Sequence, residues 1–345
     1  MKFNNLPYLV SKEILTHLPV ADLLIFSQCS KKHMSYIQNL LKHELPKIGH
    51  IRSYSKEGEN LWEIGGCSDA NIEMKPSSEI GDNTVCKLRL FGLELSCCPA
   101  TDHEPMIVFG EIEHGEYLFQ CFHNSIYTLF GPLMEYQLFV LNLVKKTNHI
   151  PKVQNITKTA FLSIYTKELE RPLKDFLLFS PNMEYISFSH MNSCDFLDIP
   201  GMRQIPELSI GCFYGNFGHL LRKFTGKHLR VESVNDEDST PVIEFLLAWK
   251  SKSAYGNIEL LKVRCMSAFL NVDEIIEKCD IKQLDLDKDP PLSNVPSTFE
   301  ESFKSHNYIV RESDGHVASL RITPECFHFG VWNCTEQQFL EEHLK

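Results

Sequence analysis

A short pattern of an apolar residue, a variable residue and a second apolar residue recurs along the C-terminal two thirds of the chain. These triplets are Leu162-Ser163-Ile164, Ile186-Ser187-Phe188, Leu208-Ser209-Ile210, Leu229-Arg230-Val231, Leu261-Lys262-Val263 and Leu284-Asp285-Leu286. Their starts are 24, 22, 21, 32 and 23 residues apart. Because apolar residues that alternate with other residues are typical of strands, the pattern predicts one short strand per period. A stacked array of similar units is the fold that such a period favours.

Four of the five steps lie within the range of about 20–29 residues that is typical of leucine-rich repeats. The longest step contains the helical pattern of Pro241 to Trp249, so we interpret it as a repeat with an enlarged helical side. Phe245 and Trp249 lie one helical turn apart, and we predict that both pack in the core. The consensus asparagine of leucine-rich repeats is absent, so the match is one of period only. We therefore predict an irregular leucine-rich-repeat-like α/β domain, with a compact α/β domain around a mixed sheet as the alternative.

The middle residues of the triplets would share one face of such a sheet, because successive side chains of a strand point to opposite faces. These residues are Ser187, Ser209, Arg230, Lys262 and Asp285. Solenoids commonly bind partners on their strand face. We predict that this polar face binds a partner and that Arg230 and Lys262 contact an acidic or hydrogen-bonding stretch of it. A solvated sheet face without a ligand is the alternative.

The C-terminal segment has a different pattern. Residues 308–311 and 317–322 flank Ser313-Asp314-Gly315, a strong hairpin turn signal. Alternating apolar residues at 327, 329 and 331 predict a third strand, and Thr335 is positioned to cap a final helix. We predict that this hairpin closes the open end of the sheet, since an exposed edge invites aggregation.

The first 45 residues predict three short helices, the second capped by Asp22 and the third by Ser30. Leu6-Pro7, Ile14-Leu15-Thr16-His17-Leu18-Pro19, Asp22-Leu23-Leu24 and the polar-basic stretch Ser27 to Lys32 follow one another in order. This succession resembles an F-box. Such a small unit has more apolar residues than three helices can cover, so some of them must face a partner.

Two later segments extend the resemblance. Ile243 to Lys250, followed by Asn257 to Val263, is similar to a helix–loop–strand segment of nematode F-box proteins that carry a type-2 F-box-associated domain. Residues 309–320 resemble the closing hairpin of that domain, with Tyr-Ile-Val-Arg and Ala-Ser-Leu as conservative departures. Residues 52–160 are covered only by the order of the matched stretches.

The resemblance implies a substrate-recognition adaptor of an SCF-type E3 ubiquitin ligase rather than an enzyme. Its F-box would dock on a Skp-family adaptor and, through it, a cullin, while the C-terminal domain binds an unidentified protein target. The residues expected at the adaptor interface are Leu6, Pro7, Val10, Ile14, Leu15, Leu18, Pro19, Leu23 and Leu24. A protein-interaction module that joins no ligase is the alternative, and a cysteine-dependent enzyme is a more distant one.

Charge and cysteine usage limit the other classes of function. The chain has a formal net charge of −11, and the first 50 residues hold six lysines and three acids, a net charge of +3. A general nucleic-acid-binding protein would need a basic face, so we expect no nucleic-acid partner. The 12 cysteines mostly fall singly in apolar stretches, and we expect reduced thiols, no metal, no cofactor and a cytoplasmic or nuclear location.

The same analysis predicts the division of the chain. We expect an F-box at residues 1–48, a polar, glycine-bearing linker or loop region at 49–83, and an α/β substrate-binding domain at 84–345. The apolar segment from Ser125 to Val144 also contains Gly131-Pro132 and a glutamate. These residues argue against a membrane span, and we expect a buried helix after the Gly-Pro break.

Overall fold

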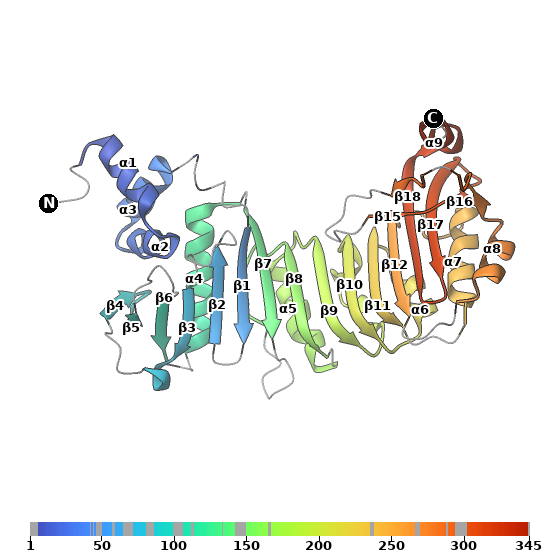
Figure 1. Ribbon diagram of the computed structural model, residues 1–345. Helices are drawn as coiled ribbons and strands as arrows, with labels where there is room; N and C mark the ends of the chain where they lie inside the picture. Colours follow the sequence, from blue (N-terminus) through green and yellow to red (C-terminus); the bar gives the residue numbers. More distant parts are fainter. Residues whose placement is uncertain are drawn as a thin grey trace. The chain divides into compact units, whose positions relative to one another are not determined.

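The computed structural model of the 345-residue chain divides into two compact units (Figure 1). Unit 1 comprises Met1–Leu162 and Asp175–Met183, and unit 2 comprises Ser163–Lys174 and Glu184–Lys345. The structure describes residues 6–41, 43, 45, 50–56, 59–64, 72–80, 86–98, 106–111, 114–132, 134–141, 150–164, 167–234, 238–265, 270–287, 289–293 and 302–343. Among the described residues, no helix is long and apolar enough to cross a membrane.

Unit 1 begins with a three-helix head, as the sequence predicted. Its helices are α1 (Tyr8–His17), α2 (Val20–Gln28) and α3 (Lys31–Leu40). The Ser30 side chain caps α3 by accepting a hydrogen bond from the backbone N–H of His33. The predicted cap of α2 differs, because α2 begins after Pro19 and Asp22 lies in its first turn. Proline fits this position because the first helical N–H groups lack partners within the helix.

The sheet of unit 1 begins within the stretch that the sequence predicted as a linker. Its strands are β1 (His50–Lys56), β2 (Glu59–Ile64), β3 (Ile72–Pro76), β4 (Cys86–Leu90), β5 (Leu93–Cys98), β6 (Met106–Gly110), β7 (Glu135–Leu141) and β8 (Lys158–Ile164). They lie side by side in the order β8-β7-β1-β2-β3-β6-β5-β4. The linker prediction for 49–83 is therefore corrected: Ile51, Trp62, Ile64, Ile72 and Met74 are buried, and their strands belong to unit 1.

Helix α4 (Gly115–Phe130) supplies the apolar layer against this sheet. The Trp62 ring lies 5.0 Å from the Phe119 ring and 5.2 Å from the Phe122 ring, measured between centroids. Gly131, with φ of +81°, ends the helix, and β7 follows. The buried helix expected after the Gly-Pro break thus lies before it. A positive φ favours glycine, so Gly131 stops the helix and the apolar run continues as a strand.

Four parallel strands begin unit 2: β9 (Tyr185–Met191), β10 (Glu207–Phe213), β11 (His228–Val234) and β12 (Leu260–Cys265). All four contain predicted triplets, and they lie in sequence order as a stacked array requires. The helices of unit 2 are α6 (Phe217–Lys223), α7 (Thr240–Lys250) and α8 (Val272–Cys279). Helix α5 (Glu170–Phe179) is divided, with residues 170–174 in unit 2 and residues 175–179 in unit 1. Short 3-10 helices in the described part of the chain include η4 (Ser77–Glu79), η6 (Lys167–Leu169), η7 (Asp195–Asp198) and η8 (Met202–Gln204).

Helix α7 packs on one face of this sheet, where Phe245 and Trp249 are fully buried. The Trp249 ring lies 5.1 Å from Phe329 in an edge-on contact, and the Arg311 guanidinium carbon lies 5.0 Å from the Trp249 ring centroid. The prediction that Trp249 is a core residue is confirmed. The apolar residues of the triplets face this side, so their middle residues lie on the opposite face.

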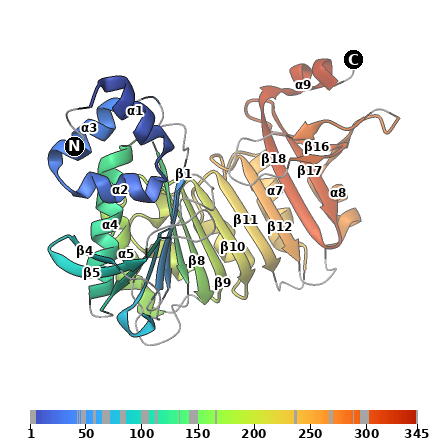
Figure 2. The same ribbon diagram turned by 60° about the vertical axis from the view of Figure 1, so that its left-hand side comes forward.

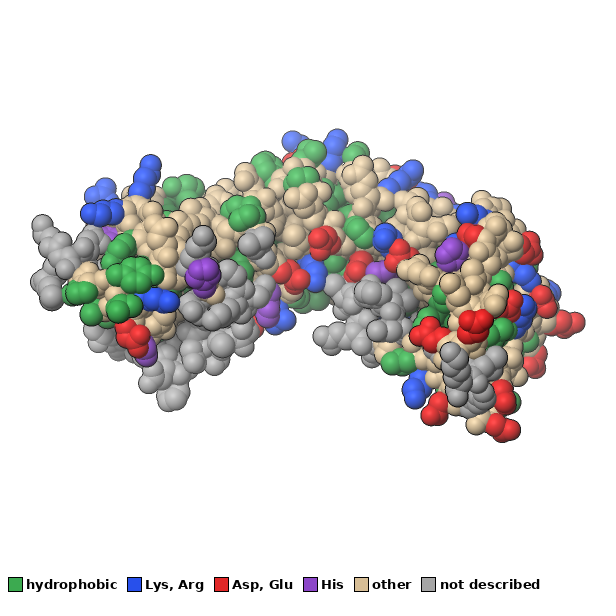
Figure 3. Space-filling view, turned by 90° about the horizontal axis from the view of Figure 1, so that it is seen from above, with side chains coloured by type: hydrophobic (Ala, Val, Ile, Leu, Met, Phe, Trp, Pro, Cys, Tyr) green, Lys and Arg blue, Asp and Glu red, His purple; other side chains and the backbone are tan. Residues whose placement is uncertain are grey.

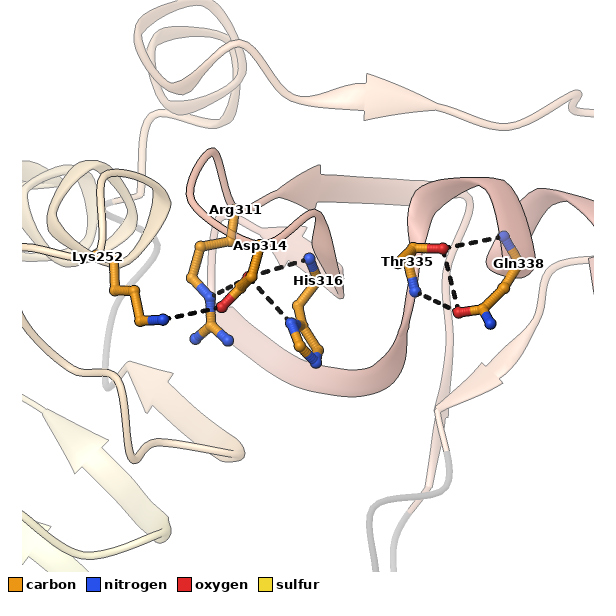
Figure 4. Close-up of polar contacts among 6 residues, drawn as sticks. All are labelled: Lys252, Arg311, Asp314, His316, Thr335 and Gln338. Atoms are coloured by element: carbon orange, nitrogen blue, oxygen red, sulfur yellow. Dashed lines mark hydrogen bonds and ion pairs between the residues drawn. The ribbon is translucent and has the colours of Figure 1, made fainter.

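The predicted C-terminal hairpin closes the parallel array. Its strands are β13 (Lys282–Gln283), β16 (Asn307–Val310), β17 (His316–Thr323) and β18 (Cys326–Thr335), followed by α9 (Glu336–His343). Strand β18 pairs antiparallel with β12. The turn is fixed by Asp314, whose carboxylate accepts hydrogen bonds from Arg311 Nε at 2.9 Å and Lys252 Nζ at 3.1 Å (Figure 4). The Thr335 hydroxyl oxygen caps α9 by accepting from the Gln338 backbone N–H.

The sixth triplet, 284–286, forms no strand. Leu284 is buried with Tyr308, Val317 and Phe339, whereas Leu286 is 64% exposed. Strand β13 is only two residues long and pairs with β16 rather than with β12. A separate two-stranded sheet, β14 (Leu292–Ser293) and β15 (Phe303–Lys304), lies nearby in the sequence.

Candidate functional site

Within unit 1, the head contacts helix α4 through α2 and α3. Gln38 Nε2 of α3 donates a hydrogen bond of 2.6 Å to the Thr128 carbonyl oxygen of α4. Ser125 of α4 donates one of 3.3 Å to Gln28 Oε1 of α2. In both ribbon views α2 lies against α4, in agreement with these contacts (Figures 1 and 2). Helix α1 packs on α3, which leaves much of the α1 side chains in solvent.

Four apolar side chains of α1 are exposed, three of them consecutive and the fourth one helical turn later, and we name them the α1 surface. They are Tyr8 (59% exposed), Leu9 (74%), Val10 (45%) and Ile14 (40%). In the space-filling view, apolar side chains gather on the head (Figure 3). Several exposed apolar side chains on one short helix are typical of a protein–protein contact.

The structure divides the nine residues predicted at the adaptor interface. Pro7, Val10, Ile14 and Pro19 are exposed, and Leu6 and Leu18 are half-buried. Leu15, Leu23 and Leu24 are at most 5% exposed and form the core of the head. Tyr8 and Leu9 were not among the predicted residues. The available signal was the run Tyr8-Leu9-Val10, because three consecutive helical residues point in three directions and cannot all be buried.

On unit 2, four of the five predicted face residues form a row across neighbouring strands. Ser187 pairs with Ser209, Ser209 with Arg230, and Arg230 with Lys262 in the parallel register. We name these four residues the ladder face.

Two details of the predicted face are corrected. Asp285 lies after β13, outside the row, because β18 rather than the sixth triplet pairs with β12, and His328 of β18 is the partner of Lys262. The face is also less exposed than expected, since Ser209 is 9% and Lys262 5% exposed.

The cationic end of the ladder face borders a small hollow. Its volume is about 80 Å³, and it is lined by Arg230, Val231, Glu232, Lys262, Val263, Arg264 and His328. We name this site the basic hollow. Three cations and one carboxylate line it. Glu232 accepts a hydrogen bond from Arg230 Nε, and its other oxygen lies 4.0 Å from Arg264 Nη1.

The pKa of His328 reflects the burial of its ring and the charged side chains around the hollow. Burial, together with the smaller effects of the nearby cations Lys262, Arg321 and Arg264, lowers the pKa of its imidazole to about 4, while Glu232 acts in the opposite direction. The ring is therefore neutral at pH 7. Arg321 belongs to the same row, because it pairs with His328 in the antiparallel register of β17 and β18. The positive potential thus extends over four adjacent strands.

The row beside the ladder face contains a buried histidine. His228 Nδ1 lies 2.8 Å from Glu207 Oε1, and its Nε2 lies 3.5 Å from Glu259 Oε2. Phe303 of β15 is buried with Leu260 next to this row, and its ring lies 5.4 Å from that of His328. These contacts join neighbouring strands and support one edge of the hollow.

The expectation of no metal and the distant alternative of a cysteine-dependent enzyme both concern the arrangement of the His, Cys, Asp and Glu side chains. Among the described residues, no three His, Cys, Asp or Glu side chains are grouped to hold a metal ion. Burial raises the pKa of the Cys97 and Cys194 thiols, which makes them poorer nucleophiles.

Comparison with known proteins identifies one part of the chain. Residues 3–44 match the F-box domain. No curated protein and no solved structure matches the chain. The matched range contains α1, α2 and α3, including the exposed α1 surface. F-box domains bind Skp-family adaptors, which link them to cullins. The head of this chain is therefore an F-box domain.

Proposed function

We propose that the chain is a substrate-recognition adaptor of an SCF-type ubiquitin ligase. The F-box match at residues 3–44, coinciding with an exposed apolar surface on α1, is the observation that carries this proposal. The head would bind a Skp-family adaptor and thereby a cullin. F-box proteins are generally adaptors, and the ubiquitin-transfer chemistry would belong to other subunits.

Unit 2 would hold the target protein. Its parallel strands are stacked in sequence order, which is the arrangement expected of a leucine-rich-repeat-like domain. Its assignment to a type-2 F-box-associated domain of the nematode type rests on the sequence resemblance alone. The ladder face is the proposed contact surface. Holding a target lysine near a ubiquitin-loaded enzyme raises its effective concentration, which is the contribution that an adaptor makes to the rate.

The α1 surface gives a direct test. We would change Val10 and Ile14 to alanine together, because both are at least 40% exposed and their loss should leave the head folded. Interface anchors of this kind each contribute on the order of 1–2 kcal/mol, so binding to a Skp-family adaptor should weaken roughly 30-fold or more. Leu15 is fully buried and is kept, since its loss would unfold the head.

The matched control is Leu247→Ala, an equally exposed leucine on α7. Affinity for the purified adaptor would be measured by calorimetry, with circular dichroism to check folding. Adaptor binding by the Val10→Ala, Ile14→Ala variant that equals the control would refute the proposal. Adaptor binding without cullin recovery from cells would favour the non-ligase interaction module.

A further inference from the structure

The hairpin at one edge of the unit 1 sheet places two cysteines opposite each other. Strands β4 and β5 pair antiparallel, and β4 is the last strand in the order of the described strands (Figure 1). Cys86 of β4 is the direct partner of Cys97 of β5 in this register. Directly paired residues point to the same face of a sheet, so both side chains lie on one side of the hairpin. Both are free thiols in the structure.

The spacing of the paired strands suits a disulfide. The Cα atoms of opposite residues in an antiparallel pair are about 4.5–5.5 Å apart. Residues joined by a disulfide usually have Cα atoms about 4.4–6.8 Å apart, so this register accepts the bond without a change of pairing. The pKa of the Cys97 thiol supports the proximity, because burial raises it and the neighbouring Cys86 and Cys98 make smaller contributions in the same direction.

The two thiols differ in their access to solvent. Cys86 is exposed, whereas Cys97 is buried and pairs on its other side with the buried Val108 of β6. A dissolved oxidant can therefore reach Cys86, and Cys97 is reached from Cys86. The next residue, Cys98, pairs with Ile107, so its side chain points to the opposite face of β5. The strand thus presents one cysteine toward Cys86 and one away from it.

We propose that Cys86 and Cys97 are a modification site that closes to a reversible disulfide on reaction with a small disulfide such as oxidised glutathione. The Cys86 thiolate attacks one sulfur of the oxidant, which forms a mixed disulfide and releases one glutathione thiolate. The Cys97 thiolate then attacks the Cys86 sulfur and displaces the second glutathione. The two thiol protons pass through solvent to the two released thiolates. One protein disulfide and two reduced glutathione molecules are the products.

The bond joins the strands of a hairpin whose tip packs on helix α4. The Tyr117 hydroxyl of α4 donates a hydrogen bond of 3.1 Å to the Phe91 carbonyl oxygen, and the Phe91 and Phe122 rings meet edge-on at 5.1 Å. Helices α2 and α3 of the head contact the same helix. The site uses neither the α1 surface nor the ladder face, so this inference does not depend on the proposed function.

The test treats the full, folded chain with oxidised glutathione and then blocks the remaining thiols with an alkylating agent. Trypsin cleaves after Lys87 and Arg89, so the peptides that carry Cys86 and Cys97 separate unless a disulfide joins them. Mass spectrometry should show the joined peptides, with fragmentation assigning the bond to Cys97, and dithiothreitol should separate them. A folded chain in which Cys86 stays free, or keeps its glutathione without forming the link, would overturn the proposal.

Cys97→Ala and Cys98→Ala are a matched pair, because the two residues are adjacent in sequence and point to opposite faces. In the folded chain, Cys98→Ala should form the link as completely as the unaltered chain. Cys97→Ala should form at least about tenfold less of it and should retain glutathione on Cys86, because no second thiol is close enough to displace it. Equal linking of the two folded variants would refute the proposal.

The same oxidation in urea shows whether the fold selects the partner of Cys86. The two variants should then link to similar extents, because the loops that they close differ by a single residue and cost nearly the same entropy. Circular dichroism before oxidation checks that each variant is folded. Cys98→Ala alone keeps the proposal testable if Cys97→Ala unfolds, since loss of the link in folded Cys98→Ala would identify Cys98 as the partner and overturn the assignment.

Discussion

Replacement of Trp249 by alanine should strongly destabilise unit 2. The indole is fully buried, with Phe329 edge-on at 5.1 Å and the Arg311 guanidinium carbon 5.0 Å from the ring centroid. Truncation of a buried tryptophan to alanine costs about 3–5 kcal/mol, which includes the lost aromatic contact and the cavity. At about 2–4 °C per kcal/mol for a unit of this size, the melting temperature should fall by roughly 6–20 °C.

Two companion variants make the measurement specific. Leu247→Ala lies on the same helix but is 44% exposed, so it should change the unfolding free energy by less than about 1 kcal/mol. Trp249→Phe should cost less than Trp249→Ala. The indole N–H is buried and has no hydrogen-bond partner among the described residues, so phenylalanine removes an unsatisfied donor as well as volume.

Scanning calorimetry and urea unfolding of the full chain would follow the transition of unit 2. Loss of stability in the order Trp249→Ala, Trp249→Phe, Leu247→Ala would agree with a core role. If Trp249→Ala melted within 2 °C of Leu247→Ala and yet lost target binding, Trp249 would be a recognition residue and the packing argument would be refuted.

The polar turn and one glycine give the remaining predictions. Contacts with Arg311, His316 and Lys252 hold the pKa of Asp314 well below its usual range, so its contribution is present above about pH 4 and lost as the pH falls further. Asp314→Asn should cost about 1 kcal/mol at pH 7, a modest value because the side chain is 25% exposed. Urea unfolding should show this difference shrinking as the pH falls below about 4. A constant difference would contradict the assignment. A Cβ at Gly226 would lie 2.7 Å from the Ile205 and Pro206 carbonyl oxygens, whereas one at Gly256 would meet nothing within 4 Å. Gly226→Ala should therefore destabilise by about 1–3 kcal/mol and Gly256→Ala should not, which thermal melts would show; equal effects would argue against the clash.

The parallel strands of unit 2 were predictable because the alternation of apolar residues within each triplet already indicates which side chains are buried. The first triplet belongs to β8 of unit 1, the next four belong to β9 to β12 of unit 2, and the hairpin turn has the expected glycine, Gly315, with φ of +71°. The prediction of a strand at the sixth triplet was wrong because its two leucines have different surroundings. Leu284 packs against Tyr308 and Phe339 of later elements, and Leu286 lies in solvent. Apolar alternation alone cannot distinguish a strand from such a single buried residue.

Other parts of the fold depend on contacts that the sequence does not display. The first three strands of unit 1 were predicted as a linker because glycines and serines separate their apolar residues, although Trp62 and Ile64 alternate as strand residues do. The basic hollow combines Arg230 with His328, almost 100 residues later. That proximity follows from the antiparallel pairing of β12 with β18, whose register the local sequence does not specify.

The two proposed binding sites use different physical interactions, and this difference bears on how the chain could work. The α1 surface is apolar, so its binding energy would come from surface removed from water and would depend little on salt. The ladder face is polar and carries Arg230 and Lys262 on adjacent strands, so its affinity for a target would depend on hydrogen bonds and on ionic strength. The residues of the two sites belong to different units. An adaptor of this kind can remain bound to its ligase through the apolar surface while targets exchange at the polar one.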